Sequence, residues 1–220
     1  MSAYRPATLR LRGGVLAELT WPPGPPRAVL VFIGATHRPV ICGALSASLN
    51  ALTLSVVPAT RDDAGTLLEW TADHAQQLVD EPEQLMIAGL HGGAGLAAAL
   101  ALRGGEDRWP AIAGQILIHP TFEPQDERQR PSAGVAPAMI ATRDAPGRRY
   151  AERLRRTGVR VCVLEHPDPF TDAVALPGAA TLLAELADAS RSIAPQRAPH
   201  SRRSARGPAH RPAPAGAQAR

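Results

Sequence analysis

The sequence predicts an α/β fold in which a mostly parallel sheet is covered by helices on both faces. Short apolar runs that are typical of buried strands alternate along the chain with helix-like segments. The 220 residues, 45% of them hydrophobic, are enough for one sizeable domain with its own core. Because crossovers between parallel strands are nearly always right-handed, this alternation predicts one doubly wound domain.

Periodicity and turn residues place the individual elements. Leu9–Leu11 and Val15–Thr20 flank Gly13-Gly14, which predicts an opening β-hairpin. Buried strands are expected at Ala28–Ile33, Leu52–Val57, Leu85–Ala88, Gln115–Ile118, Ala138–Ala141 and Val159–Leu164. Helices are expected at Ala44–Leu52, Asp63–Val79, Ala94–Arg103, Arg148–Thr157 and Leu176–Ala189.

The charge is divided unevenly along the chain, whose net charge is +4. Residues 190–220 hold seven arginines and no acidic residue, so residues 1–189 carry a net charge of −3. The tail, rich in Arg, Pro and Ala, has too few apolar side chains to order itself, and we expect it to be disordered beyond a domain of residues 1–189. A basic tail alone gives weak, salt-sensitive contacts, so no specific nucleic-acid partner is inferred.

The remaining composition favours a soluble cytoplasmic protein. Cys42 and Cys162 are too few for a disulfide framework in a chain of this length. No apolar run is long enough to span a bilayer, and the first residues lack the pattern of a signal peptide. Gly93–Ala98 matches the glycine pattern of a dinucleotide-binding fingerprint, but the acidic residue that should end the next strand is missing. No cofactor is therefore expected.

Ligands of parallel α/β sheets bind beyond the carboxyl ends of the strands, so the residues that follow each strand are the candidates for a site. In this sequence they are Gly34–His37, Pro58–Arg61, His91, His119–Phe122, Arg143-Asp144 and His166–Phe170. Among them, His37, His119 and His166 are expected to line a substrate-binding cleft.

One segment carries a specific resemblance. Asp80–Arg103 contains a strand, the turn Gly89-Leu90-His91-Gly92-Gly93 and an Ala/Leu helix. It resembles the segment around the nucleophilic serine, in the pattern G-x-S-x-G, of the hormone-sensitive-lipase-like esterases, the alpha/beta hydrolase fold-3 group. Further matches follow in order at Gln115–Pro120, Pro137–Asp144 and Tyr150–Gly158. The resemblance implies an alpha/beta-hydrolase fold, here with little or no lid.

The resemblance also implies a catalytic triad, most of which is substituted in this chain. The family's serine falls on His91, its aspartate on Asp144 and its histidine on Asp168. The family's oxyanion-hole motif falls on residues 33–36, so Gly34, Ala35 and the amide of Gly92 are the expected oxyanion donors. Losing triad members removes several orders of magnitude of rate.

We therefore expect an esterase-like protein with a degenerate triad, little or no classical ester hydrolysis and a pocket for a small ester, acid or lactone. The alternative is an active carboxylic-ester hydrolase that uses His91 with Asp144 or Asp168, with or without a divalent metal. A third hypothesis is a decaying gene with an out-of-frame tail. For His91 itself, a purely local structural role and a ligand-binding role also stay open.

Overall fold

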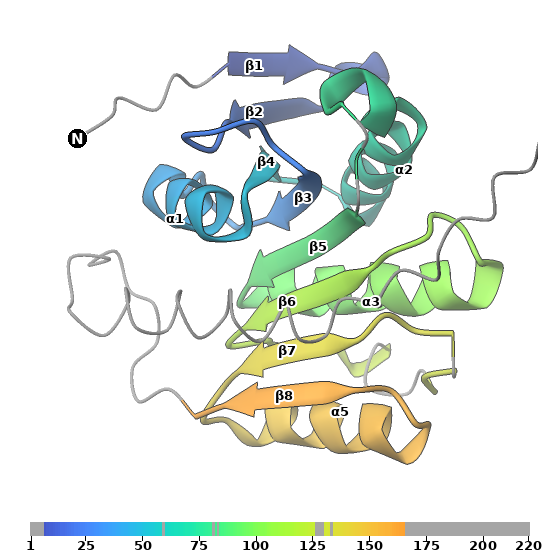
Figure 1. The fold of residues 1–220 in the computed structure, drawn as a ribbon. Helices are drawn as coiled ribbons and strands as arrows, with labels where there is room; N and C mark the ends of the chain where they lie inside the picture. The colour runs from blue at the N-terminus through green and yellow to red at the C-terminus, as the bar shows by residue number, and fades with distance from the viewer. Residues whose placement is uncertain are drawn as a thin grey trace, which may run out of the picture.

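The structure, a computed structural model, describes residues 7–165 except residues 59, 81, 83, 126–129 and 133 (Figure 1). Eight strands form one sheet in the order β1-β2-β4-β3-β5-β6-β7-β8. The strands are β1 (Ala7–Arg10), β2 (Leu16–Thr20), β3 (Ala28–Ile33), β4 (Ala51–Val56), β5 (Gln84–Leu90), β6 (Gly114–Ile118), β7 (Ala138–Ala141) and β8 (Val161–Leu164). β2 runs antiparallel to β1 and β4, whereas β3 to β8 are all parallel, so their carboxyl ends meet at one edge of the sheet.

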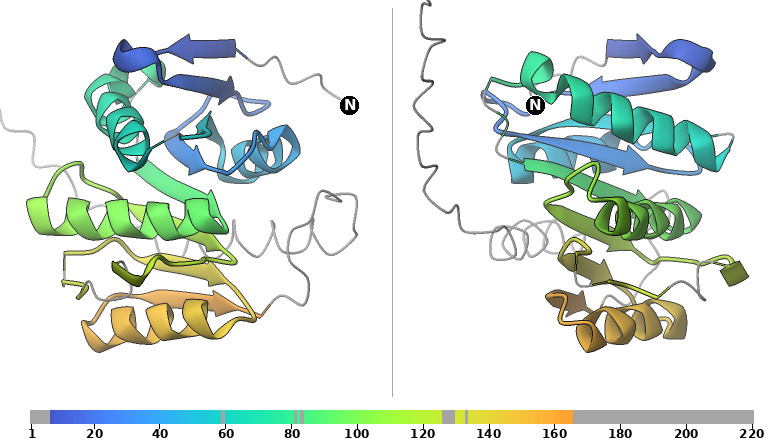
Figure 2. Two further views of the ribbon diagram at one scale, coloured as in Figure 1. Left: turned by 180° about the vertical axis from the view of Figure 1, so that it is seen from behind. Right: turned by 90° about the vertical axis from the view of Figure 1, so that its right-hand side faces the viewer.

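Helices cover the sheet on two faces (Figure 2). They are α1 (Pro39–Leu49), α2 (Arg61–Leu78), α3 (Gly92–Asp107) and α5 (Ala145–Arg156), with a short 3-10 turn, η1 (Arg12–Gly14), in the opening hairpin. The buried side chains of α1 belong to one apolar cluster, and those of α2, α3 and α5 belong to the other. The predicted fold class, with a mostly parallel sheet between helices, is confirmed.

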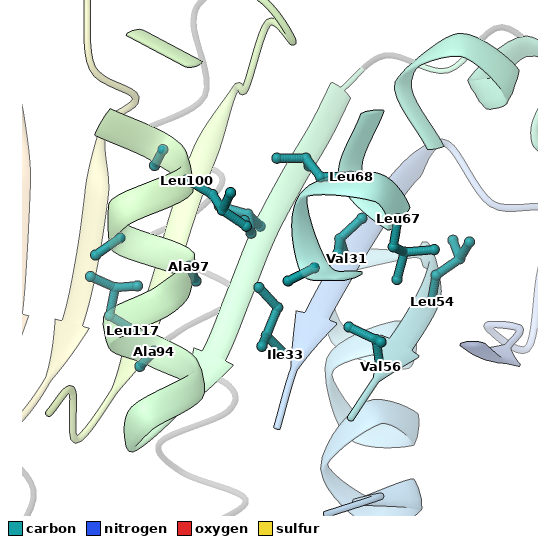
Figure 3. Packing of buried hydrophobic residues seen from close by; sticks show 14 of the residues in the cluster. Val31, Ile33, Leu54, Val56, Leu67, Leu68, Ala94, Ala97, Leu100 and Leu117 are labelled. Carbon is teal, nitrogen blue, oxygen red and sulfur yellow. The ribbon is translucent and has the colours of Figure 1, made fainter. Parts of the chain in front are cut away.

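The core is built by side chains that alternate along the strands, as the period of two in a β-strand requires. In β3, Val31 and Ile33 point to the cluster under α2 and α3, whereas Leu30 and Phe32 point to the cluster under α1. Figure 3 shows Val31 and Ile33 beside side chains of α2, α3 and the neighbouring strands. Burying each such side chain contributes roughly 1.5–3 kcal/mol, so the strands that end at the site have a rigid base.

Most predicted elements are confirmed with shifts at their ends, and one helix differs more. The helix expected at Ala44–Leu52 begins at Pro39 and ends at Leu49. Proline suits the first helical turn because its missing N–H needs no partner there. Asn50 takes the left-handed conformation, φ 48°, that ends the helix, and β4 starts at the next residue. The helix expected at Leu176–Ala189 and the tail lie outside the described residues.

None of the helices in the described part of the chain combines the length and the apolar character needed to cross a membrane.

Candidate functional site

The turn between β5 and α3 holds His91 in an unusual backbone conformation. His91 has φ 53° and ψ −119°, a region that side-chain-bearing residues rarely adopt. The turn is tight because two glycines lie against backbone: a Cβ on Gly89 would lie 2.4 Å from the Gly93 carbonyl oxygen, and a Cβ on Gly93 would lie 2.2 Å from the Ile33 carbonyl oxygen. Glycine is therefore required at both positions if His91 is to be held in this turn.

Backbone hydrogen bonds fix this turn to the neighbouring strand end. The His91 N–H donates to the Ile118 carbonyl at 2.9 Å, at the end of β6. The His91 carbonyl accepts from the N–H groups of Ala94, Gly95 and Thr121 at 3.0 to 3.1 Å. The conformation of residue 91 is thus set by its surroundings, and strain held in this way is characteristic of functional turns.

The first turn of α3 leaves two backbone donors open. Ala94 and Gly95 use the His91 carbonyl, but among the described residues no acceptor is found for the Gly92 and Gly93 N–H groups. The His91 side chain makes no capping hydrogen bond either. The amino end of a helix with open N–H groups attracts an anionic or carbonyl oxygen, helped by the helix dipole.

A cavity of about 480 Å³ lies beside this helix end. Its lining includes Gly34, Ala35, Thr60, Arg61, Gly92, Gly93, Leu96, Thr121, Phe122 and Glu123. Arg61, the first residue of α2, forms an ion pair with Glu123 at 3.3 Å between the Arg61 Nη2 and Glu123 Oε2 atoms. The rule that ligands bind beyond strand ends pointed to Pro58–Arg61, but it missed Leu96, which lies about one turn into α3.

The expected oxyanion donors all line the cavity, and one of them is engaged. Gly34, Ala35 and Gly92 are lining residues. The Gly34 N–H, however, donates to the Val56 carbonyl at 3.1 Å, which continues the β3–β4 ladder past the end of the strand. Gly34 therefore does not offer its N–H to a ligand, because a backbone N–H supplies one hydrogen bond and β4 takes it.

The three histidines predicted to line the cleft have different outcomes. His119 lies beside His91, with ring centroids 6.1 Å apart and planes inclined by 35°, but it is not among the residues that line this cavity. The His37 Nδ1 atom instead lies 3.4 Å from the Oε2 atom of Glu18 on β2, and His37 does not belong to the cavity lining found among the described residues. His166 lies outside the described residues.

Asp144 follows β7 at the same edge of the sheet and is exposed there as the residue before α5. Its backbone N–H donates a hydrogen bond to the Thr142 Oγ1 atom at 3.1 Å. Within the described ranges, neither a hydrogen bond nor an ion pair joins the Asp144 carboxylate to His91. Asp168 lies outside those ranges, so the predicted His91, Asp144 and Asp168 constellation stays a prediction.

Comparisons with known proteins agree with this architecture. Residues 41–146 match the model of a family described as alpha/beta hydrolase fold. A protein named probable carboxylesterase 3, from Arabidopsis thaliana, is 30% identical over 93 residues, which are 39% of this chain. The matched segment spans only 30% of the length of that relative.

Solved esterase structures resemble the chain over most of its length. A hyperthermophilic esterase from the archaeon Pyrobaculum calidifontis has a TM-score of 0.73 and 20% identity, covering 88% of this chain and 84% of that one. A thermostable esterase from Pseudomonas putida has a TM-score of 0.72 and 17% identity, covering 89% of this chain and 84% of that one. At these identities the likeness concerns the fold.

Proposed function

We propose that this chain, whose fold is the alpha/beta hydrolase fold, is an esterase-like protein that binds a small ester, carboxylic acid or lactone and does not hydrolyse esters by the serine mechanism. The observation that carries the proposal is the imidazole of His91 at the strained turn between β5 and α3. The serine mechanism requires a hydroxyl at this point, activated by a base. His91 has no hydroxyl to offer.

The cavity beside the turn supports the binding half of the proposal. Its volume of about 480 Å³ suits a small organic molecule. Leu96 and Phe122 offer apolar surface, and the Gly92 and Gly93 N–H groups offer hydrogen bonds to a carbonyl or carboxylate oxygen. Apolar walls with a few convergent donors fit the acyl part of an ester, acid or lactone.

A second candidate is a working hydrolase in which His91 acts as nucleophile or general base. The strained backbone at His91, with φ 53°, favours it, because backbone strain of this kind is often found at catalytic turns. Asp144, and Asp168 beyond the described residues, would supply the carboxylate, with or without a bound divalent metal. This candidate uses the same pocket as the first and differs from it in that the bound ester is hydrolysed.

Ester hydrolysis by the full chain separates the two candidates. Rates on short-chain nitrophenyl esters would be measured for the wild type, His91→Ala and His91→Ser, with and without added divalent metal. We expect the three rates to agree within about twofold. The wild type and His91→Ala have no hydroxyl at this position, and the family's histidine that would activate the hydroxyl of His91→Ser falls on Asp168. Turnover by the wild type that disappears in His91→Ala would overturn the first proposal and establish the second.

Binding is tested with butyrate, ethyl butyrate and γ-butyrolactone in ligand-observed NMR. Leu96→Trp would fill the cavity and abolish saturable binding, because Leu96 is part of its wall. Leu16→Trp is the matched control: Leu16 is 44% exposed on β2 and takes the same substitution away from the cavity. The proposed binding pocket would be refuted if the wild type bound none of the probes, or if Leu96→Trp still bound all three.

A further inference from the structure

Two histidines share a backbone feature that ordinary helix ends do not explain. Four non-glycine residues in the described part of the chain have φ clearly positive: Asn50, His91, Arg108 and His119. Asn50 and Arg108 end the helices α1 and α3, where a left-handed residue is a common way to stop a helix. His91 and His119 instead end the neighbouring strands β5 and β6, at the sheet edge where ligands of this kind of fold bind.

Both residues are fixed at the backbone. The His91 N–H donates to the Ile118 carbonyl at 2.9 Å, and the His119 N–H donates to the Ala141 carbonyl at 2.8 Å. These hydrogen bonds join the ends of β5, β6 and β7 at the two residues that carry the imidazoles. His119 is only 5% exposed, so the packing around it further restricts its ring.

The distance between the two rings suits a metal ion. Their centroids are 6.1 Å apart and their planes are inclined by 35°. Two imidazoles that bind one ion through bonds of about 2.0–2.1 Å have ring centres roughly 5–6 Å apart, so a small rotation of the half-buried His91 side chain closes the remaining gap. Rigid backbone on both sides lowers the entropy lost when the pair orders around an ion.

We propose that His91 and His119 form a two-imidazole site for a first-row transition-metal cation of the Cu²⁺, Ni²⁺ or Zn²⁺ class. Imidazole nitrogen is a preferred donor for these ions, with Cu²⁺ bound most tightly. No cluster of three metal-ligating side chains occurs among the described residues, so the remaining coordination positions are left to water or to a ligand oxygen. The bound ion would therefore keep open coordination positions.

The metal site does not rest on the proposed binding of esters or acids, because metal titration includes neither. The test is a Cu²⁺ titration of the full chain by calorimetry, with electron paramagnetic resonance of the bound ion. The variants are His91→Asn and His119→Asn, since asparagine is among the residues that tolerate positive φ best. His37→Asn and His74→Asn are matched controls within the described residues, and a His166→Asn/His200→Asn/His210→Asn triple variant controls for the other histidines of the chain.

We expect saturable Cu²⁺ binding by the wild type, with resonance from two imidazole nitrogens. Affinity falls at least tenfold in His91→Asn and in His119→Asn, and the controls bind as the wild type does. His119 is buried, so His119→Asn can lower the melting temperature of the protein. In that case the Cu²⁺ affinity of His91→Asn alone decides, since His91 is only half-buried. Absent saturable binding, wild-type affinity in His91→Asn, or binding lost only in a control variant would overturn the site.

Discussion

A Cβ atom on Gly93 would lie 2.2 Å from the carbonyl oxygen of Ile33, so the first turn of α3 packs backbone against backbone on the end of β3. In the same turn, a Cβ atom on Gly89 would lie 2.4 Å from the carbonyl oxygen of Gly93. Between Gly89 and Gly93, only His91 carries a large polar side chain, and its placement depends on the glycines on both sides. The backbone contacts that stabilise this turn are therefore the same contacts that place His91.

Gly93→Ala should lower the free energy of unfolding by about 3 kcal/mol, because the new methyl group must displace β3 or α3. Urea denaturation of the full chain measures it. Gly24→Ala is the control, with a change under about 0.5 kcal/mol, since the nearest atom to a Cβ there is the Asn50 Oδ1 at 3.9 Å. A loss below about 1 kcal/mol in Gly93→Ala would show that the turn relaxes easily.

The start of α2, which brings Arg61 to the cavity, is stabilised by a capping box. The Thr60 Oγ1 accepts from the Asp63 N–H at 3.2 Å, and the Thr60 N–H donates to the Asp63 Oδ2 at 2.8 Å. Thr60→Ala should cost about 1 kcal/mol in urea denaturation. Thr66→Ala, an exposed threonine on the same helix, should change stability by less than about 0.5 kcal/mol. Equal effects of the two would argue against the cap.

Cys42 should make the fold sensitive to alkaline pH. Burial raises the pKa of its thiol from 9.0 to about 12, and nearby Glu18 adds to the rise while a hydrogen bond with Ser55 opposes it. The folded state holds the proton more tightly than the unfolded state, so the stabilising effect is complete below pH 9 and is lost as the pH rises toward 12.

The measurable consequence is a slope of about 1.4 kcal/mol per pH unit between pH 9 and pH 12 from this one group. Urea denaturation under reducing conditions at pH 9 and pH 10 should show the wild type losing up to that amount more than Cys42→Ala. Cys162→Ala leaves the Cys42 thiol in place and should keep the wild-type slope. Parallel losses in wild type and Cys42→Ala would mean that the Cys42 thiol titrates no differently in the two states.

The fold could be predicted because its strands are continuous apolar runs separated by clear turns. Ala28–Ile33 and Ala138–Ala141 were expected with the bounds that β3 and β7 have. The helix before β4 was placed too late, because Gly43 and the short polar side chains of residues 46–50 obscure its period. Its true start at Pro39 is marked by a local signal, proline in the first helical turn, that periodicity alone does not register.

The site was less accessible to sequence reasoning because its parts meet only through the strand register. His91 and His119 lie 28 positions apart in the sequence, which does not reveal that they are close in space. Their closeness follows from the parallel pairing of Leu90 with Ile118. The engagement of the Gly34 N–H by Val56 likewise depends on how far the β3–β4 ladder extends. His37 follows a strand as His119 does, yet Glu18 from β2 holds it elsewhere.

Arg61 should set the preference of the cavity between acids and neutral ligands. It lines the cavity and is paired with Glu123, whose side chain is 65% exposed, so a ligand carboxylate can compete for the guanidinium at little cost. A partly exposed pair of this kind contributes about 0.2–1 kcal/mol, which corresponds to a loss of up to about fivefold in affinity. Arg61→Gln should therefore weaken butyrate binding by that factor and leave γ-butyrolactone binding unchanged, as measured by ligand-observed NMR. Arg103→Gln removes a comparable surface ion pair, with Glu69, and should alter neither ligand. Equal weakening of both ligands by Arg61→Gln would mean that Arg61 shapes the cavity and does not recognise charge.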